Sequence, residues 1–313
     1  MEKRITLVEK KSLLLASISF TTLAFVTLFF TETSYYLLIL QTGIVNCFHS
    51  DMSKIWMIPI GGILGILLIS TIRQRSIVVS IALFMQTLLM FFYPAFNGIM
   101  LFILGVLSGL IAPYLIYQLK DLKQIVLVLG LAYLLGTFAV NIPAEQRGLL
   151  AIILSIVALF SSYFVVPSQE TKRKITSYQP YIIIFIWLVL DATLFETLAR
   201  SSHGIWAHEK FTLSIALFHL IGLYMGYKLS NYHHNNRIVL TLFFLSYLFF
   251  AFNLTYLLVI VYPMVISYYN VLILKRFMTL SFEALTLVSL SLWLSAGMGL
   301  SLALLFHGSL FII

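Results

Sequence analysis

Residues 180–200, PYIIIFIWLVLDATLFETLAR, decide how the rest of the chain is interpreted. The stretch is long enough to cross the roughly 30 Å hydrocarbon core of a bilayer as a helix. It carries two carboxylates, Asp191 and Glu196, in an otherwise largely apolar run. A charged side chain near the bilayer centre costs roughly 2.5–3.5 kcal/mol on insertion scales, so such residues usually face water, a partner charge or an ion. The stretch therefore predicts a membrane-spanning helix with a functional role.

The whole chain has the composition of an integral membrane protein. Of its 313 residues, 61% are hydrophobic and 10% are charged, and the mean hydropathy is +1.03. That leaves too little polar surface to cover a water-soluble globule of this length. The basic N-terminal segment MEKRITLVEKK has no small-residue cleavage site behind its apolar run, so the first span is expected to stay attached.

Hydropathy and loop signals predict eleven spans. They cover residues 13–45, 55–72, 77–93, 98–118, 123–141, 149–166, 180–200, 212–229, 238–253, 255–274 and 284–306. The first segment is long for one perpendicular helix, but a long helix can tilt, and splitting it would place Glu32 in a hairpin. We therefore expect one helix with Glu32 inside it.

The basic residues predict the topology. With the N-terminus in the cytoplasm, the inner segments hold fifteen Lys and Arg residues and the outer segments hold four, which is the positive-inside pattern. This pattern predicts a multi-pass protein of the cytoplasmic or plasma membrane, with its C-terminus outside. It also accounts for the net charge of +8 without a nucleic-acid partner.

Faint internal repetition suggests two related halves. The tripeptide Thr-Leu-Phe occurs at residues 27–29 and again at 193–195. Residues 111–120, IAPYLIYQLK, align without gaps with residues 266–275, ISYYNVLILK. Glycines four residues apart also occur in the second and eighth spans, as Gly61 and Gly65 and as Gly222 and Gly226. Six spans followed by five fit a duplication in which the sixth span has no counterpart.

On these features the chain resembles the major facilitator superfamily, in which a cytoplasmic linker joins two six-helix bundles. The loop after the second span in that family reads approximately G-x-L-x-D-R-x-G-R; Gly65, Leu67 and Arg73 match, while Ile69 replaces the aspartate. The resemblance implies an all-α polytopic membrane fold with an N-terminal six-helix bundle (1–166), a cytoplasmic basic linker (167–179) and a C-terminal five-helix bundle (180–313).

The resemblance also implies that the first and seventh helices line a central cavity. Glu32, Asp191 and Glu196 would then surround one aqueous pathway. Asp191 and Glu196 are five residues apart, about 140° around a helix, so they point in different directions. Glu196 precedes Arg200 by four residues, and its alternative role is an ion pair. Asp191 has no basic residue within one turn and is the candidate for protonation or cation binding.

Polar aromatic and amide side chains recur in the helices that would line this cavity. The further candidate binding residues are Tyr36, Gln41, Trp187, Tyr114, Gln118, Tyr269 and Asn270. Tyrosines near helix ends are also typical of the interfacial aromatic belt, and this alternative stays open for Tyr114 and Tyr269. A lone buried histidine such as His219 is typical of a packed, neutral side chain.

Soft or borderline metal ligands follow the first and seventh spans at the predicted outer face. The candidate metal ligands are Cys47, His49, Met52, His203 and His208. Their spacing matches no closed metal motif. The single cysteine, Cys47, excludes an intrachain disulfide.

The sequence thus predicts a secondary active transporter that moves a small solute by alternating access and is coupled to protons or another cation, as a symporter. No cofactor is expected, since the chain has no G-x-x-x-x-G-K-[ST] motif. The expected partners are membrane lipid and a small-molecule or ion substrate. The alternatives are a copper-like metal importer of the same fold, a membrane-embedded enzyme that uses His203, His208 and Glu209, a scaffold subunit, and a ten-helix drug/metabolite transporter.

Overall fold

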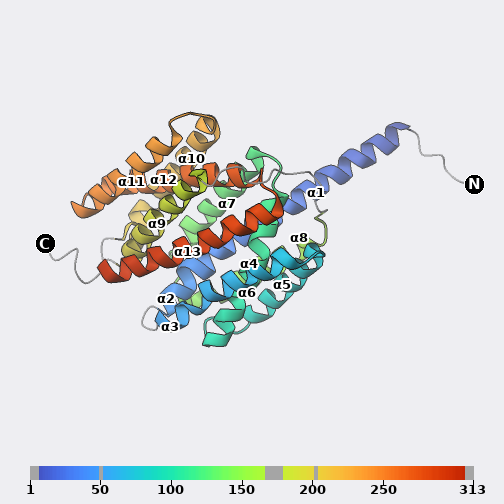
Figure 1. The fold of residues 1–313 in the computed structure, drawn as a ribbon, viewed down its shortest axis with the longest axis horizontal. Coiled ribbons are helices and arrows are strands. Elements are labelled where there is room, and N and C mark those ends of the chain that lie inside the picture. Colours follow the sequence, from blue (N-terminus) through green and yellow to red (C-terminus); the bar gives the residue numbers. More distant parts are fainter. Residues whose placement is uncertain (1–6, 49–51, 166–178, 201–203, 307–313) are drawn as a thin grey trace, which may run out of the picture.

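The computed structural model describes residues 7–48, 52–165, 179–200 and 204–306, and in these ranges the chain is helical and contains no β-strand (Figure 1). The long helices are α1 (Leu7–Tyr35), α4 (Met57–Thr71), α5 (Arg75–Met90), α6 (Gly98–Gln118), α7 (Leu122–Ala139), α8 (Gly148–Ser162), α9 (Gln179–Arg200), α10 (Thr212–Leu229), α11 (Asn235–Ala251), α12 (Thr255–Phe277) and α13 (Phe282–Phe306). The predicted linker lies outside the described residues.

The first span is one continuous helix, as predicted. α1 runs without a break into a π-helical segment, Tyr36–Ile44, and then into the short helix α2 (Val45–Cys47). In the π segment the Thr42 hydroxyl donates to the carbonyl of Leu37, 2.8 Å away and five residues back. Segments of π-helix are uncommon and often lie at functional sites. A second short helix, α3 (Met52–Ile55), precedes α4.

The helices are those of a multi-pass integral membrane protein. Seven have the length and apolar composition to cross a membrane. They correspond to Phe20–Cys47, Gly98–Gln118, Leu122–Ala139, Pro180–Ala199, Glu209–Leu229, Thr255–Phe277 and Phe282–Ala303. The other four predicted spans coincide with the shorter apolar helices α4, α5, α8 and α11. The sides on which the termini lie stay a prediction.

Helix packing follows a repeated pattern. α4 packs on α6 as α10 packs on α12, α5 packs on α6 as α11 packs on α12, and α1 packs on α7 as α9 packs on α13. Contacts between the two sets are paired as well: α7 meets α10 and α12, and α13 meets α4 and α6. α8 packs on α1 and α5, and it is the sixth span that was expected to have no counterpart. The contacts among α1 to α7 and those among α9 to α13 thus follow the same pattern, and the division into two bundles related by a twofold axis stays a prediction.

Three of the four paired glycines lie where helix backbones approach closely. A Cβ atom added at Gly61 or Gly65 would lie 2.1 Å from the carbonyl oxygen of Phe102 or Val106 on α6. At Gly222 it would lie 2.2 Å from the Met264 carbonyl oxygen on α12, whereas at Gly226 it would meet the Val271 side chain at 2.7 Å. Small residues permit such contacts between helices in a membrane. The prediction of close helix contacts is therefore confirmed, but Gly226 is not equivalent to the other three.

Candidate functional site

Asp191 lies in α9 and is held by two tyrosines of α12. The Tyr269 hydroxyl donates to Asp191 Oδ2 at 2.6 Å, and the Tyr262 hydroxyl donates to Oδ1 at 3.0 Å. All three side chains are buried, with Asp191 9% exposed. Among the described residues, the hydrogen bonds of this carboxylate are those with the two tyrosines, and no basic side chain is paired with it. Two hydroxyl donors thus replace the water that a carboxylate loses in a membrane.

A chain of polar side chains extends from this carboxylate into the first half of the protein. Tyr269 interacts with its neighbour Asn270. Asn270 Nδ2 donates to the Tyr133 hydroxyl of α7 at 2.8 Å, and the Tyr133 ring stacks on His219 of α10 with ring centroids 4.5 Å apart. His219 Nδ1 in turn lies 2.7 Å from Ser267 Oγ on α12. We call Asp191, Tyr262, Tyr269, Asn270, Tyr133, His219 and Ser267 the polar network.

The first helix also approaches Asp191. Tyr36, at the start of the π segment, interacts electrostatically with both Asp191 and Glu196. Its side chain is 43% exposed, whereas the two acids are buried. Tyr36 is therefore less buried than the two acids beside it. The side chain of Arg200, the predicted ion-pair partner of Glu196, lies outside the described residues.

Glu32 occupies a different place. Its carboxylate accepts a hydrogen bond from Gln86 Nε2 of α5 at 3.0 Å, and both side chains are buried. In the part of the chain that the structure describes, Gln86 is the hydrogen-bond partner of Glu32, and no interaction joins Glu32 to Asp191. That Glu32, Asp191 and Glu196 surround one pathway stays a prediction.

The remaining predicted binding residues are dispersed. Trp187 is fully buried, and the Arg276 guanidinium lies 5.7 Å from its ring centroid. Tyr114 interacts with Gln118 one turn further along the same helix. Gln41 is half-buried on the π segment.

The predicted metal ligands do not gather in the described part of the chain, which holds no group of three or more His, Cys, Asp or Glu side chains that could bind a metal ion. Cys47 Sγ lies 4.0 Å from the Tyr93 hydroxyl, and His208 is exposed. His49, His203 and the side chain of Met52 lie outside the described residues.

Sequence reasoning missed Arg147, which it placed in an outer loop. The side chain is 2% exposed and lies between the end of α7 and the π segment. Its guanidinium donates to the carbonyls of Leu38, Val140 and Ile142, each at 2.9 Å, and to Thr42 Oγ1 at 2.7 Å. Burial lowers the pKa of this guanidinium, and the four acceptors compensate its charge. The sequence around Arg147 could not predict this role, because two of its acceptors, on Leu38 and Thr42, belong to a helix more than a hundred residues away.

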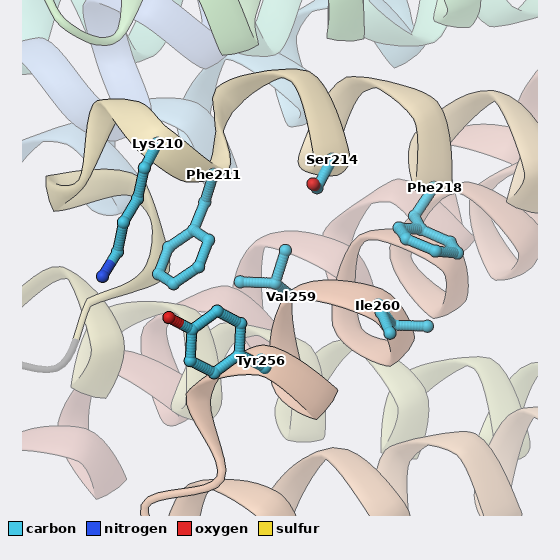
Figure 2. A pocket seen from close by; sticks show the side chains of 7 residues that line it. All are labelled: Lys210, Phe211, Ser214, Phe218, Tyr256, Val259 and Ile260. Carbon is cyan, nitrogen blue, oxygen red and sulfur yellow. The ribbon is translucent and has the colours of Figure 1, made fainter.

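Two cavities lie away from these groups. One, of about 310 Å³, is lined by α10, by the turn before α10 and by α12. Lys210 and Tyr256 lie at one end of it, and Phe218 and Ile260 lie at the other (Figure 2). The other, of about 280 Å³, lies between α4 and α13 beside Trp56 and Trp293. Neither is lined by Asp191, Glu32 or the polar network. We therefore place the candidate site at the buried polar groups, since the charged chemistry lies there.

Comparison with known proteins gives matches among solved structures. No family model and no curated protein matches the chain. Among solved structures, the chain is similar to the crystal structure of a bacterial homologue of the human lysosomal transporter Spinster, in an inward-facing and unoccupied conformation. The two share 13% sequence identity with a TM-score of 0.48, over 94% of this chain and 81% of the other. A similarity of this size does not assign an activity, so the function is inferred below from the residues of this chain.

Proposed function

We propose that the protein is a secondary active transporter that moves a small solute by alternating access and is coupled to protons or another cation. The observation that carries this proposal is the polar network, which connects a buried carboxylate of one half to α7 of the other half. The pseudo-repeated contacts of the two halves support it, because transporters built from repeats work by moving one repeat against the other.

The unfavourable free energy of placing Asp191 inside a membrane-spanning helix supports a functional role for it. An acid inside a spanning helix is expensive, and such residues usually mark a substrate or ion pathway. Here two tyrosine hydroxyls satisfy the carboxylate, and within the described residues no basic side chain neutralises it. A cation, or a cationic group of the solute, would replace one of these hydroxyl donors and interact more strongly with the negative carboxylate. Tyr36 supplies a less buried group next to this carboxylate.

The cross-half contact supports coupling between binding and movement. Asn270 donates to Tyr133 on α7, while its neighbour Tyr269 donates to Asp191. A displacement of α7 relative to α12 would break the first bond and release Asn270. Binding of a cation at Asp191 would displace Tyr269, and through it would act on Asn270 as well. Binding at Asp191 and rocking of the halves would therefore share one set of hydrogen bonds.

Uptake into proteoliposomes with an imposed pH gradient tests the proposal, with a panel of labelled cationic, anionic and neutral solutes. We expect one class to accumulate, and Asp191→Asn to lower its uptake by at least about tenfold, the change that corresponds to roughly 1.4 kcal/mol of lost interaction. Glu145→Gln is the matched control, because Glu145 is an exposed acid in the turn before α8. Full uptake by correctly folded Asp191→Asn would remove Asp191 from the mechanism.

A further inference from the structure

A second buried acid remains outside the polar network. Glu32 is 8% exposed and Gln86 is fully buried, and Gln86 Nε2 donates to Glu32 Oε1 at 3.0 Å. The other end of the amide, Gln86 Oε1, has no hydrogen-bond partner within the described part of the chain. Leaving such a buried acceptor unsatisfied costs about 1–3 kcal/mol, and buried polar groups are rarely left so. The pair therefore lacks one donor.

Neighbouring side chains do not supply this donor. The Tyr35 hydroxyl donates to Met90 Sδ at 3.1 Å. The hydroxyl of Thr87 donates to the carbonyl of Leu83, and that of Thr31 donates to the carbonyls of Thr27 and Leu28. The hydroxyl protons of these three side chains are thus already used. The buried Ser34 hydroxyl on the same helix has no partner, but Ser34 lies two residues after Glu32, about 200° around the helix, and so points away from the pair. The missing donor must be added to the pair itself.

A proton on Glu32 completes the pair. A carboxylic acid and a primary amide have matching donor and acceptor atoms: the amide N–H donates to one carboxyl oxygen, and the acid O–H donates to the amide oxygen. The first of these two bonds is present in the structure. Protonation of Glu32 would supply the second and remove a charge from the apolar interior.

A metal ion fits this place less well. Calcium and magnesium ions take about six or more oxygen ligands, whereas the pair offers the oxygens of Glu32 and Gln86. The amide group that faces the carboxylate is moreover the Nε2 donor, which would repel a cation. A proton needs one acceptor and is compatible with this orientation.

We propose that Glu32 and Gln86 form a proton-binding site in the first half, in which Glu32 carries the coupling proton as a neutral carboxylic acid. This inference rests on the proposed function and names its coupling ion. Asp191 has the contrasting arrangement, because each of its oxygens accepts from a tyrosine hydroxyl, as suits a charged carboxylate. Loading adds one proton from water to the Glu32 carboxylate, and release returns it to water, without any electron transfer.

Few other groups titrate beside Glu32. Tyr35 on the same helix interacts with it electrostatically. Within the described residues, no titratable or charged side chain of α5, α7 or α8 does so. A proton gained or lost at this pair would therefore be a property of Glu32.

Infrared difference spectroscopy of the purified full-length protein in lipid nanodiscs tests the inference, because a protonated carboxyl group has its own carbonyl stretch. The probe is the proton alone, delivered by stepping the pH of the buffer. We expect a protonated-carboxyl band at neutral pH that is lost in Glu32→Gln and kept in Asp191→Asn and Glu196→Gln. In Gln86→Leu the band should shift in frequency, because its hydrogen-bond partner is removed. The exposed-acid variant Glu145→Gln should leave the band unchanged.

Three results would overturn the inference. The first is a band lost in Asp191→Asn and kept in Glu32→Gln, which would place the proton on Asp191. The second is the lack of such a band together with stabilisation by sodium or calcium that disappears in Glu32→Gln, which would show a metal site. The third is full proton-driven uptake by Glu32→Gln, which would leave the transporter intact and remove this proton site. A Glu32 band in a protein that takes up no solute would instead uphold the site and contradict the proposed function.

Discussion

Tyr114 and Tyr269 occupy the same place in the two halves of the protein but have different partners. The gapless alignment of residues 111–120 with residues 266–275 pairs them. Tyr269 donates to Asp191, whereas Tyr114 interacts with Gln118 of its own helix. The alignment of the Thr-Leu-Phe tripeptides pairs Asp191 with Phe25, which stacks on Phe29. The repeat therefore sets where a tyrosine lies, and the presence of an acid on the facing helix sets what it does.

The acids themselves follow no such symmetry. In the second half, an acid is held by hydroxyl groups of α12 at the boundary with the first half. In the first half, an acid is held by an amide of α5. One scaffold thus carries two chemically different acid sites. This difference would let one site hold a charge while the other exchanges a proton.

The largest expected effect comes from placing a large side chain at the close helix contacts that occur within each half. Gly65→Leu and Gly222→Leu would drive a side chain into the backbone of the facing helix, where even a Cβ would lie 2.1 or 2.2 Å from a carbonyl oxygen. Backbone cannot move aside as a side chain can, so we expect a destabilisation beyond the usual 1–3 kcal/mol of overpacking and little monodisperse protein. Size-exclusion chromatography after solubilisation measures this.

Glycine-to-alanine variants sharpen the comparison between the halves. Gly226→Ala should cost less than Gly65→Ala, because its Cβ would meet the Val271 side chain, at 2.7 Å, instead of backbone. Gly136→Ala is the control, since its Cβ would lie 4.0 Å from the nearest atom. Equal melting temperatures for Gly65→Ala and Gly136→Ala would contradict the close contact of α4 with α6.

The sequence predicted the features that depend on local pattern. The spans follow from runs of apolar residues, and the single first helix follows from the position of Glu32. Asp191 could be selected because its sequence neighbours contain no basic residue. Its partners could not: Tyr262 and Tyr269 lie more than seventy residues away along the chain, and their contact depends on how α12 packs. The same holds for Gln86 and Tyr133, whose roles depend on contacts between helices.

A smaller effect is expected at Arg147, which connects the first helix to the loop before α8. Arg147→Leu would leave three carbonyls and the Thr42 hydroxyl without their donor. Hydrogen bonds to charged groups contribute about 1.5–3 kcal/mol, and the freed carbonyls can recover part of this from water. We expect a loss of about 2–4 kcal/mol of stability, read as a lower melting temperature in detergent.

The exposed cation Lys210, in the turn before α10, is the matched control. It lies over the rings of Phe211 and Tyr256, and Lys210→Leu should lower stability by no more than about 1 kcal/mol. The loss of stability in Arg147→Lys should lie between those of Arg147→Leu and Lys210→Leu, because lysine keeps the charge but lacks the planar set of donors of a guanidinium. Equal melting temperatures for Arg147→Leu and Lys210→Leu would show that the guanidinium does not stabilise the π segment.

The smallest effects are expected from removing one hydroxyl in each half. Tyr269→Phe deprives Asp191 Oδ2 of its donor and should lower uptake by up to about tenfold, with a loss of about 1.5–3 kcal/mol of stability. Tyr114→Phe removes a hydrogen bond between neutral groups of one helix, which contributes about 0.5–1.5 kcal/mol. Its effect on uptake should be the smaller of the two, because the partner of Tyr114 is the neutral Gln118 and no acid of the described residues interacts with it. Both variants keep the aromatic ring, so packing is preserved and the comparison isolates the hydroxyl. Equal falls in uptake would mean that Tyr114 also contributes to the solute pathway and that the tyrosines act alike despite their different partners.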